Sequence, residues 1–128
     1  MKFLVDTHIL IWAVLNSSKL SDRARAVLSQ ADCEYCFSAA SIWEIALKRM
    51  KHPDQFPVSA REARELFISA GFEELGVSSN HCAEVESLPP IHGDPFDRIL
   101  IAQALSEGMK LVTHVRMVVQ YGDVAVAV

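Results

Sequence analysis

The sequence predicts an α/β fold in which helices cover both faces of a mostly parallel sheet. Short apolar runs alternate with segments of helical periodicity along the chain, which is the order expected for a parallel sheet. No repeat, linker or low-complexity segment interrupts this order, and 128 residues are enough for one hydrophobic core. We therefore expect a single domain, residues 1–128, with functional residues at the carboxyl ends of the strands.

Strands are expected where short apolar runs end in a turn or in a helix start. The clearest cover residues 2–5, 34–38, 72–77 and 110–113, and a weaker fifth covers 123–128. Helices are expected over 7–15, after the capping residue Ser21, and over 39–50, 59–70, 79–88 and 94–107. Within 39–50 the periodicity places Ile42, Ile45, Ala46 and Met50 on one face.

The composition is that of a globular domain, with 51% hydrophobic and 22% charged residues. No apolar run approaches the length needed to cross a bilayer, and Asp6 interrupts the first one too early for a secretory signal. We expect a cytoplasmic protein without a membrane segment. A net charge of −4 argues against binding nucleic acid by bulk attraction, but it is compatible with acids gathered at a metal site.

Three cysteines without a secretory signal do not indicate a disulfide framework. Cys33 and Cys36 form a C-x-x-C pair that His81 and Cys82 would complete as a zinc site, but the second pair lacks the usual ligand spacing. The favoured interpretation is that Cys33 and Cys36 are small buried residues around a strand.

Four acids occupy positions at which a parallel sheet gathers functional groups. Asp6 ends the first strand, Glu44 lies in an otherwise apolar helix, and Asp94 and Asp97 lie in the first turn of the clearest helix. Asp94 and Asp97 are three residues apart and share a helix face. Clustered carboxylates are the ligands that Mg²⁺ and Mn²⁺ prefer, and such ions activate water and neutralise phosphate in phosphodiester hydrolysis.

Each acid also has a purely structural interpretation. Asp6 caps the helix that begins at Thr7, and Glu44 pairs with Lys48 one turn later. Asp94 is an N-cap followed by proline, and Asp97 favours the positive end of the helix dipole. Neither a nucleophile elbow nor a glycine-rich phosphate loop offers a competing chemistry.

The motifs together resemble the PIN-domain family, in the form typical of VapC-like toxins of type II toxin–antitoxin systems. The matching segments are FLVDTH at 3–8, SAASIWEI at 38–45, DPFDRILIAQA at 94–104 and LVT at 111–113, in order over nearly the whole chain. The resemblance implies a three-layer α/β/α fold and Mg²⁺- or Mn²⁺-dependent endonucleolytic cleavage of RNA. It also implies homodimers and a small antitoxin partner that inserts a peptide into the active-site groove.

Carried over position by position, the resemblance assigns the metal to Asp6, Glu44 and Asp97, and Asp94 matches an additional catalytic acid. The supporting residues that orient these acids would be Thr7, Ser38 and Thr113. Arg98 and Lys48 are candidate RNA contacts, although Lys48, Arg49 and Lys51 also suit a solvated helix end.

The chain departs from the family pattern at one position. The fourth motif usually continues Thr-x-Asp, whereas here Thr113 and His114 are followed by Val115, which offers no oxygen. Asp123 has the surroundings of a turn residue, and His114 is a softer ligand than Mg²⁺ prefers.

The leading hypothesis is therefore a toxin-type ribonuclease. One alternative is a weakly active or inactive variant that mainly binds its antitoxin, and another is a structure-specific DNA nuclease.

Overall fold

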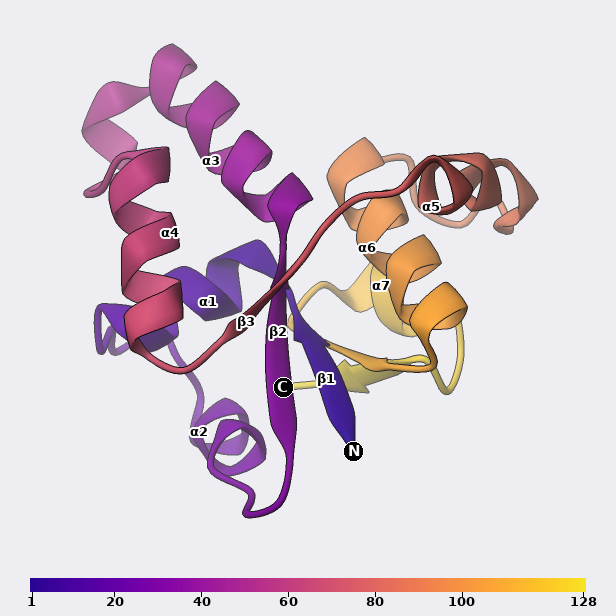
Figure 1. Cartoon of the computed structure of the whole chain (residues 1–128), viewed down its shortest axis with the longest axis horizontal. Helices are drawn as coiled ribbons and strands as arrows, with labels where there is room; N and C mark the ends of the chain where they lie inside the picture. Colours follow the sequence, from indigo (N-terminus) through magenta and orange to yellow (C-terminus); the bar gives the residue numbers. More distant parts are fainter.

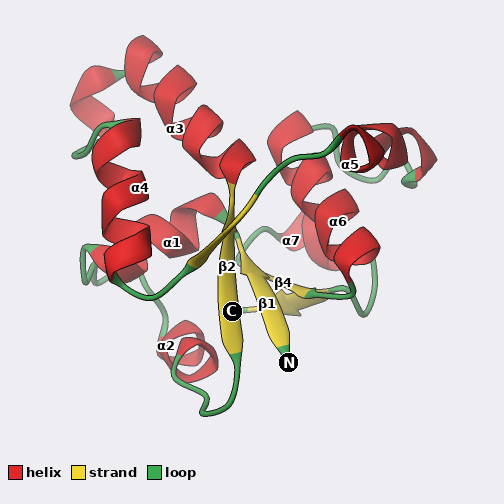
Figure 2. Cartoon of the chain, viewed as in Figure 1, coloured by secondary structure: helices red, strands yellow, loops and turns green.

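Five parallel strands form the centre of the computed structural model, which describes all 128 residues. They run in the order β3-β2-β1-β4-β5, so that β1 lies in the middle with β2 and β4 beside it (Figures 1 and 2). Their bounds are β1 Lys2–Val5, β2 Glu34–Ser38, β3 Glu73–Leu75, β4 Lys110–Thr113 and β5 Ala125–Ala127. The expected parallel sheet is confirmed.

Helices cover both faces of this sheet and give three layers, as predicted (Figure 2). One layer holds α1 Thr7–Val14, α2 Asp22–Leu28, α3 Ala39–Lys51 and α4 Ala60–Ser69 (Figure 1). The other holds α5 Ser79–Glu84, α6 Pro95–Glu107 and α7 Arg116–Val119, and short 3₁₀ turns cover Pro53–Gln55 and Val85–Ser87. No helix combines the length and the apolar character that crossing a membrane requires.

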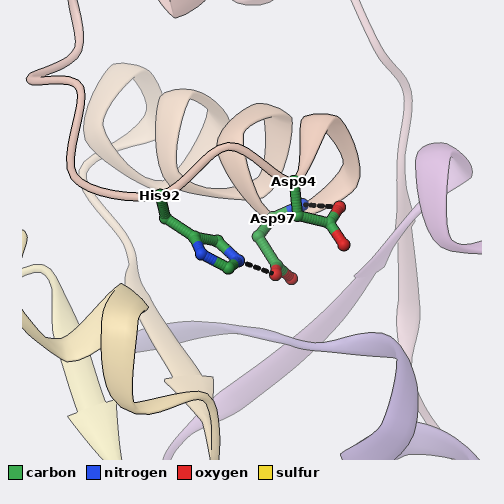
Figure 3. A group of neighbouring side chains, drawn as sticks. All are labelled: His92, Asp94 and Asp97. Carbon is green, nitrogen blue, oxygen red and sulfur yellow. Dashed lines mark hydrogen bonds and ion pairs between the residues drawn. The ribbon is translucent and has the colours of Figure 1, made fainter.

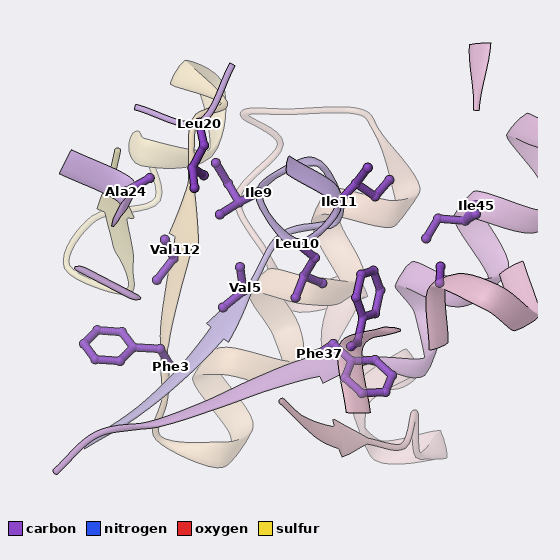
Figure 4. Packing of buried hydrophobic residues seen from close by; sticks show 12 residues of the cluster. Phe3, Val5, Ile9, Leu10, Ile11, Leu20, Ala24, Phe37, Ile45 and Val112 are labelled. Atoms are coloured by element: carbon purple, nitrogen blue, oxygen red, sulfur yellow. The ribbon is translucent and has the colours of Figure 1, made fainter. Parts of the chain in front are cut away.

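Alternation along the strands divides the core into two clusters. Phe3 and Val5 of β1 point into a cluster shared with α1–α4, whereas Leu4 between them belongs to a cluster shared with α6 and α7 (Figure 4). Phe37 and Cys36 of β2 divide in the same way. Strands buried on both faces are characteristic of parallel sheets and explain why the segments are continuous apolar runs.

The helix boundaries follow capping chemistry. The Ser21 side chain caps α2, and Ser59 forms a capping box with Glu62 at the start of α4. Gly108 ends α6 at a φ of 66°, a left-handed conformation that glycine adopts without steric cost.

Several predicted boundaries were too long, and one helix was not predicted. Only Glu73–Leu75 of the expected strand 72–77 pairs, and only Ala125–Ala127 of 123–128, because both lie at sheet edges with one neighbouring strand. The helix expected over 79–88 tightens into the 3₁₀ turn after Glu84. Helix α7, with two adjacent valines, lacks a helical sequence signature.

The face predicted for α3 was also partly wrong. Ile45 is buried and Ile42 is half-buried, but Met50 is 81% exposed because the end of the helix extends past the core.

Candidate metal and catalytic site

Asp6 lies where the central strand β1 passes into α1, and its side chain is held on several sides. Its backbone N–H donates to the Val112 carbonyl at 3.0 Å, which fixes it against β4. Its carboxylate accepts from the Ile9 N–H at 3.0 Å, as the N-cap of α1, and from the Thr113 hydroxyl at 2.7 Å. His114 Nδ1 lies 3.5 Å from the same oxygen as Thr113.

The surroundings of Asp6 favour its ionised form. The residue is only 3% exposed, and burial acts to raise the pKa of its carboxyl group. The hydrogen bonds from His114, Ile9 and Thr113 outweigh burial, so the pKa of Asp6 lies below its ordinary value. A buried, ionised carboxylate at the end of the central strand is therefore in place to act as a cation ligand.

Glu44 is a buried acid of α3 that contacts the start of α1. It is 5% exposed and accepts a hydrogen bond from the Thr7 hydroxyl at 2.6 Å. Thr7 Oγ1 also lies 2.9 Å from Ser41 Oγ, a contact that the sequence did not indicate. The pairing of Glu44 with Lys48 one helical turn later is confirmed.

The third group of ligand atoms comes from the loop before α6 and its first turn (Figure 3). One ligand atom each from His92, Asp94 and Asp97 lies within 4.8 Å of the others. Asp94 caps α6, accepting from the Phe96 N–H at 2.8 Å and the Asp97 N–H at 3.3 Å, so its predicted capping role is confirmed. His92 Nε2 lies 2.7 Å from Asp97 Oδ2.

Negative charge is crowded at Asp97. Burial raises the pKa of its carboxyl group, and repulsion from Asp94 and Asp6 raises it further, against the lowering effect of His92. A bound cation would relieve both effects, because it replaces lost hydration and offsets the repulsion. The donor set, mostly carboxylate oxygens at partly buried positions, thus fits a hard divalent cation such as Mg²⁺ or Mn²⁺.

The predicted acids share one electrostatic neighbourhood, but they do not form one tight group of ligand atoms. The charge of Asp6 acts to raise the pKa of Asp97, and the charges of Asp6 and Glu44 act to raise the pKa of His8. The compact group instead joins Asp94 and Asp97 to His92. His92 was missed from the sequence because it lies in an irregular loop before the recognisable helix start.

The predicted supporting residues behave differently from one another. Thr113 bonds to Asp6 and Thr7 to Glu44, whereas the Ser38 hydroxyl accepts from the Ala40 N–H at 3.0 Å as the N-cap of α3. Of the candidate RNA contacts, Lys48 is paired with Glu44. Arg98 donates to backbone carbonyl oxygens, including Pro89 and His92 at 3.1 Å and Val85 at 2.9 Å. Arg98 therefore anchors the loop that carries His92.

Val115 lies one residue beyond His114, at the N-cap of α7. Its side chain makes no capping hydrogen bond, and it packs against the core cluster shared with α6 and α7. Its N–H donates to the Thr113 hydroxyl at 3.0 Å, and that hydroxyl donates to Asp6. The backbone of Val115 is therefore linked to the Asp6 carboxylate through the Thr113 hydroxyl.

The fold and the acids define the class of the protein, a three-layer α/β/α domain with carboxylates at the carboxyl edge of its parallel sheet. Residues 3–115 match the family model described as "PIN domain", and the chain belongs to that family.

Known proteins resemble the chain over most of its length. It is 27% identical over 114 residues to the protein named "Ribonuclease VapC22" of Mycobacterium tuberculosis, covering 88% of this chain and 86% of the relative. Its fold is similar to VapBC2 from Rickettsia felis bound to a promoter DNA fragment, with a TM-score of 0.71 and 15% identity, covering 100% of this chain and 98% of the other. Its fold is also similar to a toxin–antitoxin complex from Klebsiella pneumoniae, with a TM-score of 0.67 and 18% identity, covering 97% of this chain and 95% of the other.

Proposed function

We propose that the chain is a divalent-metal-dependent endoribonuclease and the toxin of a toxin–antitoxin pair. The observation that carries the proposal is the crowding of partly buried carboxylates at Asp97, next to Asp6, in a PIN domain. The name of the mycobacterial relative, a ribonuclease, supports RNA as the substrate. An RNA substrate also favours a cytoplasmic location.

Five residues of this chain would hold Mg²⁺ or Mn²⁺, directly or through the water molecules bound to the ion: Asp6, Glu44, His92, Asp94 and Asp97. When bound, such an ion supplies an acidified water molecule and neutralises charge on the phosphodiester. Thr113 and Thr7 keep Asp6 and Glu44 in fixed orientations through the hydrogen bonds that they donate. Arg98 holds the preceding loop, and with it His92, against the start of α6.

Cleavage of RNA and of DNA with the same sequence tests this proposal directly. We expect RNA to be cut with Mg²⁺ or Mn²⁺ and to stay intact in EDTA, and DNA to resist. Asp97→Asn should lower cleavage by more than about 100-fold, since even residues that only orient metal ligands cost roughly 10- to 100-fold. Asp54→Asn is the matched control, because Asp54 is exposed in a 3₁₀ turn. Equal cleavage in EDTA, or equal cleavage of DNA, would contradict the proposal.

The partners form a second part of the proposal. Solved structures of similar fold include toxin–antitoxin complexes, which supports a small antitoxin as the partner of this chain. A homodimer is supported by α3, on which Trp43, Leu47 and Met50 are 62%, 40% and 81% exposed. A large exposed apolar strip of this kind is typical of a protein–protein contact.

A different function is favoured by one observation. Val115 lies at the position of the family's fourth acid and offers neither an oxygen ligand nor a cap to α7. The chain would then be a weakly active or inactive variant that mainly binds its antitoxin. Calorimetric titration with Mn²⁺ separates the two functions. We expect a saturable metal site if the chain is a nuclease, and none if it is a variant that mainly binds its antitoxin.

A further inference from the structure

A pocket of about 700 Å³ lies beside the acids, and the proposed chemistry does not use it. It is lined by α1, by the chain that follows α1 and by the segment after α3. The lining includes Trp12, Phe56 and His114, together with the exposed Lys19 and Gln55. The volume falls within the range of roughly 300–1,000 Å³ that is typical of ligand pockets.

Aromatic rings lead from the Asp6 carboxylate into this pocket. His114 Nδ1 lies 3.5 Å from Asp6 Oδ2. The ring centre of His114 lies 4.9 Å from that of Trp12 and 5.7 Å from that of His8. The aromatic wall of the pocket therefore begins at a candidate metal ligand.

The charge of the lining differs from that of the whole chain. The net charge of the protein is −4, yet the ionisable side chains that line the pocket are the bases His8, Lys19 and His114. Aromatic faces combined with basic groups are the usual means of binding unpaired nucleotides. A second groove, beside Trp43 and Ile99, is lined almost entirely by apolar side chains and offers no charge to a phosphate.

We propose that this pocket binds an unpaired nucleobase of the RNA next to the scissile phosphate. Trp12 stacks on the base, Gln55 offers a donor and an acceptor to its edge, and Lys19 pairs with an adjacent phosphate. The inference rests on the proposed ribonuclease function and assigns the sequence preference of that function to this pocket. Trp12 and Gln55 would act as specificity-determining residues.

Fluorescence tests the pocket without cleavage. The chain has two tryptophans, so Trp43→Phe leaves Trp12 as the sole reporter. Titration of this variant with a single-stranded oligoribonucleotide in EDTA should give saturable quenching. In a companion assay that follows the anisotropy of a labelled RNA, Trp12→Ala should weaken binding about 5- to 150-fold, the cost of losing one stacked base, and Trp12→Phe should restore most of it.

Exposed residues and altered RNA supply controls that do not depend on the core packing of Trp12. Lys19→Ala and Gln55→Ala should weaken binding, whereas Arg61→Ala on α4 should not. An abasic nucleotide scanned along the RNA should reduce wild-type binding most strongly at one position. The Trp12→Ala variant should be insensitive at that position.

The outcomes separate the pocket from the nuclease. Quenching and abasic sensitivity without cleavage support the pocket and count against the proposed function. Normal metal-dependent cleavage without RNA-dependent quenching of Trp12 overturns the nucleobase proposal and leaves the proposed function standing. The pocket would then be free to bind a segment of a partner protein.

Discussion

The Thr113 hydroxyl donates a 2.7 Å hydrogen bond to Asp6 Oδ2 across 107 positions of sequence. The contact exists because β4 pairs with β1 in a register that sets Val112 opposite Val5, so that the strands end together. Thr113 also accepts a hydrogen bond from the Val115 N–H. One hydroxyl group thus joins the two strand ends and the start of α7.

Removing this hydroxyl should weaken the site. Thr113→Val preserves shape but removes the 2.7 Å donor to one oxygen of the buried Asp6 carboxylate, which then keeps only its 3.5 Å contact with His114. We expect Mn²⁺ affinity and RNA cleavage to fall about 10- to 100-fold, as for other residues that orient metal ligands. Unfolding should cost about 1–3 kcal/mol less, the penalty of an unsatisfied buried group. Thr113→Ser should restore both quantities, and failure of that rescue would assign the effect to packing instead.

Asp6→Asn should separate the metal role of Asp6 from its capping role. Asparagine caps helices about as well as aspartate, so the chain should stay folded with α1 intact by circular dichroism. The lost charge should abolish most metal binding, as measured by calorimetry. A variant that unfolds would show instead that Asp6 is needed for the fold, which is the structural interpretation of this residue.

The ion pair between Asp6 and His114 should make stability depend on pH. The hydrogen bond to Asp6 raises the pKa of His114 above 6.5, against burial, and the pKa of Asp6 lies below 3.8. The His114 contribution is therefore full below pH 6.5 and is lost as pH rises through its folded pKa. The Asp6 contribution is full above pH 3.8 and is lost as pH falls through its folded pKa.

The pair consequently stabilises the fold most between these limits. In an NMR titration without metal, the His114 ring should titrate above 6.5, and Asp6→Asn should lower that pKa. An unchanged His114 titration in Asp6→Asn would contradict the pairing.

Self-association should depend on the exposed face of α3. Trp43→Ser with Leu47→Ser removes most of an apolar strip that the core does not use, and should leave the fold intact. Light scattering at micromolar concentration should show a dimer for the natural chain and a monomer for the double variant. Leu105→Ser is the control, since Leu105 is 56% exposed on α6. A monomeric natural chain would refute the prediction.

The sequence predicted the architecture because its strands are buried on both faces. Such strands are continuous apolar runs, and the capping residues at their ends mark where the next helix begins, as at Asp6 and Ser38. Asp94 marks the start of α6 in the same way, after a loop. The edge strands were overextended, since pairing on one side alone leaves their ends without a signal in composition. Trp43 shows the same limit, because periodicity does not reveal which apolar face lies outside the core.

The sequence predicted that Asp94 and Asp97 are neighbours, but it predicted few of the contacts around the acids. Sequence position gave Asp94 and Asp97 as neighbours on one helix face, and they are. The contacts of His92 and Ser41 depend on how the loop before α6 and the start of α3 fold back onto other elements. Such tertiary placement has no local spacing signal. Glu44 shows a second reason why its role is hard to predict from the sequence. Its contacts with Thr7 and Lys48 are compatible both with a structural role and with a role in the site.

Val115→Asp should strengthen both the metal site and the start of α7. The N-cap of α7 lacks a side-chain hydrogen bond, and aspartate there would accept from the helix N–H groups. We expect the new cap to raise the free energy of unfolding by about 0.5–2 kcal/mol. Losing the apolar contact that Val115 makes with the core offsets part of this gain. An added carboxylate near Asp6 should raise Mg²⁺ or Mn²⁺ affinity by about 5- to 150-fold, which corresponds to 1–3 kcal/mol.

Val115→Asn is the control that separates these two gains. Asparagine caps as well as aspartate but carries no charge, so it should match Val115→Asp in thermal stability and the natural chain in metal affinity. Metal titration and RNA cleavage of the three proteins, side by side, therefore decide what the valine does. If only Val115→Asp binds the ion more tightly and cleaves faster, the missing carboxylate weakens the natural chain. If all three bind and cleave equally, an acid at position 115 is dispensable, because Asp6, Glu44, Asp94 and Asp97 already supply enough negative charge to hold the ion.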